Sequence, residues 1–358
     1  MAVIDRTDSP LDLDVDDLFG KYRTMFLIRR FEEAAERQYK AARIGGYCHL
    51  SSGQEAATVG AVSALEEDDL LVTGYRCHGF ALARGVPPEA VMAELFGRAN
   101  GCAHGRGGSM HLLDVSRGYY GGWGIVAGQL PIAIGMALSL VRRGKEQAVL
   151  CELGDGAVNM GAWHESLNLA AVWNLPVVFM VVNNLYGMGT SVERASAEPD
   201  IFKRAAAFRI EGERVDGDDL EEVEWAAARL LRAARQERKP AVLEALTYRY
   251  RGHSVADAGL AYRTKEEIEE RRHEDPLVRT RESLEARGAP LEGIEALEAE
   301  VEAEVEAAVA YAEADAPPSV DRLAAGVYAA GSEEQFERMR PGSPAGEEEL
   351  VFAGGLGK

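Results

Sequence analysis

The chain has 358 residues, of which 47% are hydrophobic and 27% are charged, and its formal net charge at pH 7 is −20. This composition is typical of a soluble globular protein, and the length allows one or two domains with a sizeable core. The negative charge, without a long run of basic residues, argues against nucleic acid and membrane surfaces as partners. No apolar stretch approaches the roughly 20 residues of a membrane-spanning helix.

The cysteines and the start of the chain indicate a cellular compartment. The four cysteines, at positions 48, 77, 102 and 151, form no Cys-x-x-Cys pair, which argues against a disulfide framework or a zinc knuckle and favours a reducing compartment. Residues 1–19 are acidic and lack the apolar core of a secretory signal and the arginine-rich pattern of a mitochondrial one. We therefore expect a cytoplasmic protein.

Apolar residues recur at helical spacing over residues 16–43, 53–65 and 87–97, which predicts three helices. Residues 97–128 differ, because many glycines stand among histidine and aromatic side chains. Such a stretch is unsuited to a helix or a central strand. It is either a flexible linker or a loop that wraps around a ligand, and its ring-bearing side chains favour the ligand loop.

Helices and strands alternate from residue 129 onward. Helices are predicted at 130–141, 162–173 and 220–237, and short apolar strands at 148–153, 177–182 and 241–247. This alternation predicts an α/β fold, with a mostly parallel sheet covered by helices on both faces. A polar segment follows at 248–263, and residues 265–314 are charged and helical. We divide the chain into a lead-in (1–15), one domain (16–330) and a tail (331–358) that is expected to be mobile.

A carboxylate and an amide follow two consecutive strands. Gly154-Asp155-Gly156 comes directly after the strand at 148–153, at the edge where open parallel sheets bind ligands. The next strand ends at Asn183-Asn184, so Asp155 and Asn184 are predicted to lie side by side. A carboxylate in a phosphate cradle would repel the phosphate unless a cation lay between them. One anionic and one neutral oxygen ligand suit octahedral Mg²⁺.

Two glycine patterns leave a dinucleotide site as an alternative. Gly154-Asp155-Gly156 is formally Gly-x-Gly, although its carboxylate opposes a bare phosphate. Residues 122–127 match Gly-x-Gly-x-x-Ala before a helix, but no strand is predicted ahead of them. The sequence has no Walker-type phosphate loop, and no His-x-x-x-His pair supports a zinc cluster.

The run from Gly154-Asp155-Gly156 to Asn183-Asn184, continuing through residue 189, resembles the thiamine-diphosphate motif of the two-subunit 2-oxo acid dehydrogenases. Five further segments resemble the alpha subunits of the pyruvate dehydrogenase E1 component, in that family's order. These segments are residues 47–56, 75–80, 107–111, 124–126 and 248–254. The resemblance covers roughly residues 16–330 and implies the diphosphate-binding half of the thiamine-diphosphate-binding fold.

The resemblance implies a role for each matching position. Mg²⁺ would be bound by Asp155, the Asn184 side chain and the Tyr186 carbonyl. In thiamine diphosphate, the diphosphate would be contacted by the backbone N–H groups of Gly156 and Ala157 at a helix start, and its phosphate oxygens by Arg76 and His253. The aminopyrimidine would be contacted by the main chains of Gly124 and Val126. Met188 would lie beneath the bent cofactor. The implied catalytic residues border the diphosphate and the substrate channel: His253, His49 and Tyr75.

The resemblance also implies partners. A beta subunit would supply the glutamate that activates the pyrimidine, so an alpha2beta2 heterotetramer is expected, together with the lipoyl domain of the E2 acyltransferase. His253 would assist acyl transfer to the lipoyl group, because imidazole titrates in a useful range. Ser254 matches a regulatory phosphoserine position of mitochondrial relatives, but Ala256 replaces the next family serine and no phosphorylation is predicted.

The substrate is expected to be pyruvate, because residues 75–80 look more like those of pyruvate enzymes. Branched-chain 2-oxo acid and acetoin dehydrogenases are the alternatives. Trp123 replaces the small polar residue or histidine of relatives, which puts the size of the acyl group in doubt. A non-catalytic nucleotide-binding subunit is a more remote alternative.

Overall fold

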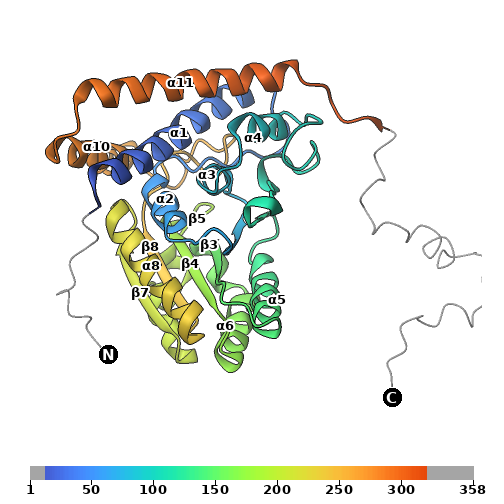
Figure 1. Ribbon diagram of the computed structural model, residues 1–358, viewed down its shortest axis with the longest axis vertical. Helices are drawn as coiled ribbons and strands as arrows, with labels where there is room; N and C mark the ends of the chain where they lie inside the picture. Colours follow the sequence, from blue (N-terminus) through green and yellow to red (C-terminus); the bar gives the residue numbers. More distant parts are fainter. Residues whose placement is uncertain (1–12, 321–358) are drawn as a thin grey trace, which may run out of the picture. The chain divides into compact units, whose positions relative to one another are not determined.

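The computed structural model of the chain describes residues 13–320 (Figure 1). The described residues up to Pro317 belong to one compact unit, and those from Pro318 belong to a second. Residues 1–12, the predicted boundary at residue 330 and the predicted tail lie outside the described residues.

A six-stranded parallel sheet organises the compact unit. Its strand order is β2-β1-β3-β4-β8-β7. The strands are β1 (Leu70–Gly74), β2 (Tyr119–Trp123), β3 (Val149–Gly154), β4 (Val177–Asn183), β7 (Glu211–Asp216) and β8 (Ala241–Leu246). A small antiparallel hairpin, β5 (Tyr186–Gly187) and β6 (Thr190–Ser191), follows β4. The prediction of an α/β fold with a parallel sheet is confirmed.

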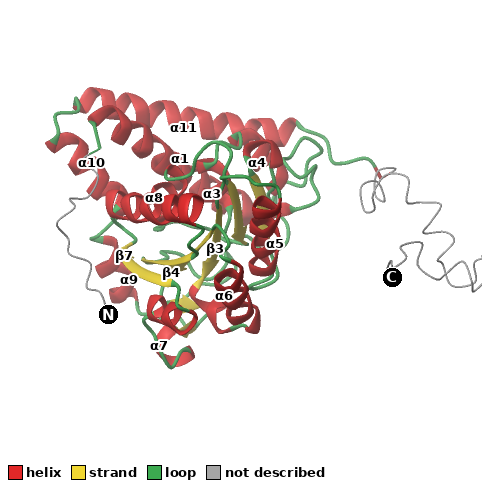
Figure 2. Cartoon of the chain, turned by 60° about the horizontal axis from the view of Figure 1, so that its bottom comes forward, coloured by secondary structure: helices red, strands yellow, loops and turns green. Residues whose placement is uncertain are grey.

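Helices cover both faces of the sheet (Figure 2). One face carries α1 (Val15–Lys40), α2 (Glu55–Ser63), α3 (His78–Ala83), α4 (Pro88–Leu95) and α8 (Leu220–Glu237). The other carries α5 (Gln129–Arg142), α6 (Gly161–Trp173) and the 3-10 helix η4 (Ile201–Phe208). Successive residues of β4 pack alternately into the two cores, as Val178 and Phe179 do. This two-sided burial explains the continuous apolar runs in the sequence.

The last two helices of the described chain pack against the first face. The region 265–314 is helical as predicted, but it forms three helices: α9 (Lys265–Arg272), α10 (Pro276–Ala286) and α11 (Leu291–Ala314). Pro276 is the first residue of α10 and Pro290 immediately precedes α11, since proline is tolerated at a helix start and not in its interior. The long α11 packs along α1 and α4 (Figure 1). None of the helices within residues 13–320 combines the length and apolar character that crossing a bilayer requires.

The other predicted elements are confirmed, with ends shifted by a few residues, by α1, α2, α4, α5, α6, α8, β3, β4 and β8. The prediction missed α3 and the strands β1, β2 and β7. The expectation that no strand stands before residues 122–127 is wrong, because β2 ends at Trp123, inside that pattern. Both glycines of this edge strand are required by the fold, because Gly121 has a φ angle of +92° and a Cβ on Gly122 would lie 2.5 Å from the Cys77 Sγ atom.

Residues 97–128 are an ordered part of the compact unit and not a linker. The buried Glu94 carboxylate accepts hydrogen bonds from the backbone N–H groups of Ala103, Gly105, Gly107 and Gly108. A carboxylate that receives four N–H groups fixes the path of a glycine-rich loop that has little secondary structure of its own.

Candidate active site

A cavity of about 950 Å³ opens at the carboxyl ends of β1, β3 and β4. All of the residues proposed from the sequence for cofactor binding or catalysis line it: His49, Tyr75, Arg76, Gly124, Val126, Asp155, Gly156, Ala157, Asn184, Tyr186, Met188 and His253. The fold therefore brings six separate parts of the chain to one edge of the sheet, where parallel sheets bind their ligands.

Asp155 and Asn184 lie side by side in this cavity, as predicted. Their strands β3 and β4 are neighbours, with Gly154 opposite Val182. Each residue is only 5% exposed, and the backbone of Asn184 helps to stabilise the charged form of the Asp155 carboxylate. Burial raises the pKa of Asp155 to about 6, because no solvent shell stabilises its charge.

The two turns that carry these residues touch backbone to backbone. A Cβ on Gly156 would lie 3.3 Å from the Gly187 Cα, so glycine permits this close approach. One detail differs from the prediction: the 3-10 helix η3 (Asp155–Asn159) stands between β3 and α6. The N–H groups of Gly156 and Ala157 therefore belong to η3 and not to the start of α6.

The proposed metal ligands fit a small hard cation. The Arg249 Nη1 atom donates to Asn184 Oδ1 at 3.0 Å and to the Tyr186 carbonyl at 3.2 Å. One cationic nitrogen in reach of both oxygens shows that these oxygens lie close together, around one point of the cavity. Together with the neighbouring Asp155 carboxylate, they are the ligand types that Mg²⁺ prefers. Within residues 13–320, no group of three or more His, Cys, Asp and Glu side chains is placed to hold a metal.

Arg76 provides a positive charge beside this point. It is buried and does not lie at the protein surface. Its guanidinium donates to the carbonyl oxygens of Leu50 and His253, the latter at 2.9 Å, and forms no ion pair in the described part of the chain. Burial lowers the pKa of Arg76 to about 10, so the group stays cationic at pH 7 and suits an anionic ligand.

His49, Tyr75 and His253 form a ring cluster at the cavity wall. The His49 ring centroid lies 4.6 Å from that of Tyr75 and 5.1 Å from that of His253. Burial, reinforced by the Arg76 charge, lowers the pKa of His49 to about 3 and that of His253 to about 4. The expectation that His253 titrates near neutral pH is therefore wrong for the structure, and both imidazoles are neutral at pH 7. The Nδ1 atom of each is buried without a hydrogen-bond partner.

The opposite end of the cavity is formed by the segment after β2. A Cβ on Gly124 would lie 2.9 Å from the His111 Nε2 atom, which explains the glycine. The Trp123 side chain lines the cavity and its indole Nε1 is buried without a partner. Ile125 and Val126 are 75% and 41% exposed, so this end lies at the protein surface.

Several polar residues that line the cavity were not among the predicted site residues, and they include Gln54, Glu152 and Arg249. The Glu152 carboxylate lies in β3 and accepts a hydrogen bond of 2.9 Å from the Gly74 N–H. Its burial raises its pKa to about 7. An acidic residue inside an apolar strand, three positions before Asp155, was the signal that could have found it.

Glu152→Gln is expected to make the chain more stable at pH 8 but not at pH 5. A glutamate with a pKa of about 7 in the folded chain, against an ordinary 4.5, binds more protons folded than unfolded. Stability is therefore lost as pH rises from about 4.5 to 7, by about 3 kcal/mol in all. Urea unfolding at both pH values checks this. A variant less stable at pH 8 would instead show that the carboxylate stabilises the fold as the counter-charge of Arg76.

Comparisons with known proteins place the chain among relatives. Residues 23–321 match the family described as dehydrogenase E1 component. The chain is 45% identical over 310 residues to the pyruvate dehydrogenase E1 component subunit alpha of Rhizobium meliloti (strain 1021), covering 86% of this chain and 88% of the relative. The same subunit of Rickettsia typhi (strain ATCC VR-144 / Wilmington) is 40% identical over 314 residues, covering 87% and 96%. The human somatic mitochondrial form is 42% identical over 324 residues, covering 90% and 82%. Since the match spans most of the sequence, the chain belongs to the dehydrogenase E1 component family.

Proposed function

We propose that this chain is the alpha subunit of a pyruvate dehydrogenase E1 component, a cytoplasmic enzyme that oxidatively decarboxylates pyruvate and acetylates a lipoyl group on E2. The family is thiamine-diphosphate-dependent, and relatives that cover most of the chain carry this subunit's name. The observation that carries the proposal is the convergence of Asp155, Asn184 and the Tyr186 carbonyl beside Arg76 in one cavity. This arrangement suits a diphosphate bound through a divalent cation.

The chain's residues would divide the cofactor between them. Asp155, Asn184 and the Tyr186 carbonyl would hold Mg²⁺. The phosphates would be bound by the Gly156 and Ala157 N–H groups, Arg76 and His253. The main chains of Gly124 and Val126 would bind the aminopyrimidine. Met188 would lie beneath the bent centre of the cofactor. When bound, thiamine diphosphate supplies the carbanion chemistry that decarboxylation of a 2-oxo acid requires. His49 and Tyr75 would orient the substrate beside it.

His253 is proposed to assist acyl transfer to the lipoyl group. Burial lowers its pKa to about 4, which favours the neutral imidazole, and its buried Nδ1 has no hydrogen-bond partner within residues 13–320. A neutral His253 would act first as a base or as an orienting group. It would act as a proton donor only after it has taken up a proton.

His253→Ala is expected to lower reductive acetylation about 10²- to 10⁴-fold, the usual contribution of a positioned acid or base. Mg²⁺-dependent cofactor binding should change by less than about tenfold, because the His253 carbonyl that anchors Arg76 is main chain. Stopped-flow acetylation of a free lipoyl domain and calorimetric binding separate the two effects. His164→Ala, an exposed histidine on α6, is the control. An unchanged acetylation rate would contradict the role.

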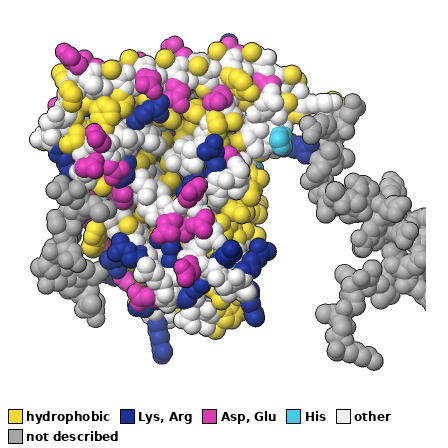
Figure 3. Space-filling model, in the orientation of Figure 1, with side chains coloured by type: hydrophobic (Ala, Val, Ile, Leu, Met, Phe, Trp, Pro, Cys, Tyr) yellow, Lys and Arg dark blue, Asp and Glu magenta, His cyan; other side chains and the backbone are white. Residues whose placement is uncertain are grey.

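The beta subunit is proposed to dock at the open end of the cavity, in an alpha2beta2 heterotetramer. Exposed apolar side chains gather on the flank of the molecule where α5 lies, and they include Ile132 of that helix (Figure 3). Together with Ile125, they provide an apolar surface of the kind that subunit interfaces bury.

Substrate choice is tested by co-purifying the chain with its beta subunit and measuring turnover of pyruvate, branched-chain 2-oxo acids and acetoin. Pyruvate is expected to give the largest kcat/KM. If the complex preferred another of these substrates, we would infer that Trp123 changes the size of the substrate pocket. A chain that binds adenine nucleotides and no thiamine diphosphate would be a nucleotide-binding subunit and would overturn the proposal.

A further inference from the structure

The side-chain amide of Asn184 is contacted at both ends. Its Nδ2 donates to Gln54 Oε1 at 3.2 Å, and its Oδ1 accepts from Arg249 Nη1 at 3.0 Å. All three side chains are buried. An amide turned by half a rotation would exchange its oxygen and nitrogen. It would then present an NH₂ group to the Arg249 donors and an oxygen to the Gln54 oxygen, so only one orientation satisfies both neighbours.

Arg249 also spans the turn that follows Asn184. Besides Asn184 Oδ1, its guanidinium donates to the carbonyl oxygens of Tyr186 at 3.2 Å and Met188 at 3.3 Å. Leu185 and Met188 have φ angles of +73° and +54°, a left-handed conformation that is costly for side-chain-bearing residues. One cation therefore gathers three oxygens of a strained turn. In the described part of the chain Arg249 forms no ion pair with Asp155, whose carboxylate stays available to a metal.

The side-chain amide of the neighbouring Asn183 is held by other partners than that of Asn184. Asn183 Nδ2 donates to Glu244 Oε1 at 2.7 Å, and Asn183 Oδ1 accepts from the Leu185 N–H at 3.1 Å. Both ends of its amide are therefore hydrogen-bonded within the fold, and the residue does not line the cavity. Of the two adjacent asparagines, only one is held with its oxygen toward the proposed cation.

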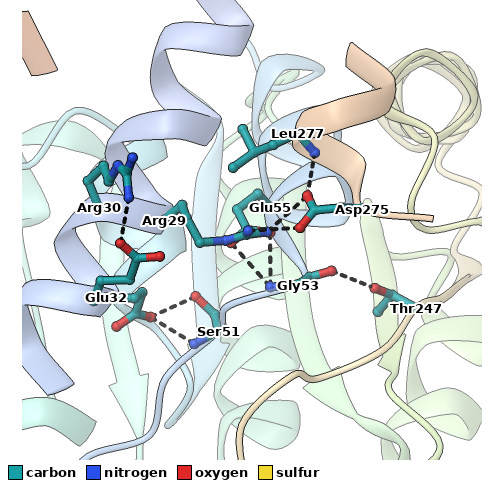
Figure 4. A network of polar contacts seen from close by, with 10 residues as sticks. Arg29, Arg30, Glu32, Ser51, Gly53, Glu55, Thr247, Asp275 and Leu277 are labelled. Atoms are coloured by element: carbon teal, nitrogen blue, oxygen red, sulfur yellow. Dashed lines mark hydrogen bonds and ion pairs between the residues drawn. The ribbon is translucent and has the colours of Figure 1, made fainter. Parts of the chain in front are cut away.

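The residues next to Gln54 are held by hydrogen bonds and an ion pair (Figure 4). On either side of it, Glu55 accepts the Gly53 N–H and pairs with Arg29 of α1. Gly53, at φ +98°, is so close to the segment of Arg249 that a Cβ would lie 2.4 Å from the Tyr248 carbonyl oxygen. The segments that carry Gln54 and Arg249 therefore pack against each other as well as against Asn184.

We propose that Gln54 and Arg249 are positioning residues of the metal site. They fix the Asn184 amide with Oδ1 toward the cation, and Arg249 holds the Tyr186 carbonyl in the same arrangement. This inference rests on the proposed function of the site. Groups that orient metal ligands typically contribute about 10- to 100-fold to metal affinity. Mg²⁺ demands near-ideal octahedral geometry, whereas Ca²⁺ accepts irregular sites, so the loss of orientation acts mainly on Mg²⁺.

The test uses the full chain with its beta partner and measures thiamine diphosphate binding by calorimetry, once with Mg²⁺ and once with Ca²⁺. Gln54→Leu and Arg249→Met are expected to weaken Mg²⁺-dependent binding about 10- to 100-fold and Ca²⁺-dependent binding less than about threefold. Gln54→Glu, which keeps an acceptor for Asn184 Nδ2, is expected to recover most of the Mg²⁺ preference.

Arg263→Met is the matched control. Arg263 donates to the carbonyl oxygens of Arg249 and Arg251 and lies over the Tyr186 ring, and so fixes the same loop, but it is not bonded to the Asn184 amide or to the Tyr186 carbonyl. Its variant should keep the Mg²⁺ to Ca²⁺ ratio. Equal losses with both metals, no loss with either, or the same ratio change in Arg263→Met would overturn the inference. An unmodified complex without Mg²⁺-dependent binding would instead contradict the proposed function itself.

Discussion

Asp155→Ala is expected to abolish Mg²⁺-dependent binding of thiamine diphosphate and to leave the fold at least as stable as before. The carboxylate is the one anionic side chain among the three proposed ligands, so its removal should weaken binding by at least about a thousandfold, or roughly 4 kcal/mol. Yet the same carboxylate is a buried charge whose pKa burial raises to about 6. Its removal relieves a desolvation cost when no metal is bound.

Calorimetric titration with thiamine diphosphate and Mg²⁺, followed by urea unfolding of the same samples, separates these two effects. Asp218→Asn is the control, because Asp218 is a partly buried carboxyl that also has a raised pKa, and it accepts from Thr247 Oγ1 at 2.6 Å outside the cavity. It should bind cofactor normally. Mg²⁺-dependent binding that survives in Asp155→Ala would show that the metal is held elsewhere.

The parts of the fold that the sequence predicts are those whose burial leaves a periodic or continuous apolar pattern. Strands β3 and β4 are buried on both faces and appear as apolar runs, with Glu152 as the one charged residue in them. Strand β7 is missed for the opposite reason. It is a half-exposed edge strand whose Arg214 pairs with Glu244 of the neighbouring β8 and with Asp200. The charged side chain of this strand is therefore paired with residues that lie far away in the sequence.

The same distinction applies to the site. Asp155 and Asn184 are predictable because the ends of adjacent parallel strands must meet at one edge of the sheet. The contribution of Arg249 is not, because it depends on the loop after β8 lying against the segment before α2. The Tyr250 N–H to Ser52 carbonyl bond at 3.1 Å is one of the contacts that joins them. No local pattern in either segment encodes that pairing.

The chain without its beta partner is expected to decarboxylate pyruvate at less than about one thousandth of the rate of the complex. In the proposed enzyme the glutamate that activates the pyrimidine belongs to the beta subunit, and a positioned proton-transfer group is worth about 10²- to 10⁴-fold. The protein surface is apolar and exposed at the end of the cavity assigned to that ring, since Ile125, beside Gly124 and Val126, is 75% exposed there.

The measurement compares CO₂ release by the chain alone, by the reconstituted complex, and by complexes of two surface variants. Ile125→Asp places a charge in the proposed interface and should weaken assembly and turnover together, because an unpaired charge buried on association is costly. Excess beta subunit should restore the turnover that dilution removes. Val278→Asp, at a half-exposed apolar position on α10, should assemble normally. Full activity of the isolated chain would mean that residues already lining the cavity, such as Glu152, perform the activation, and the beta subunit would not be needed for catalysis.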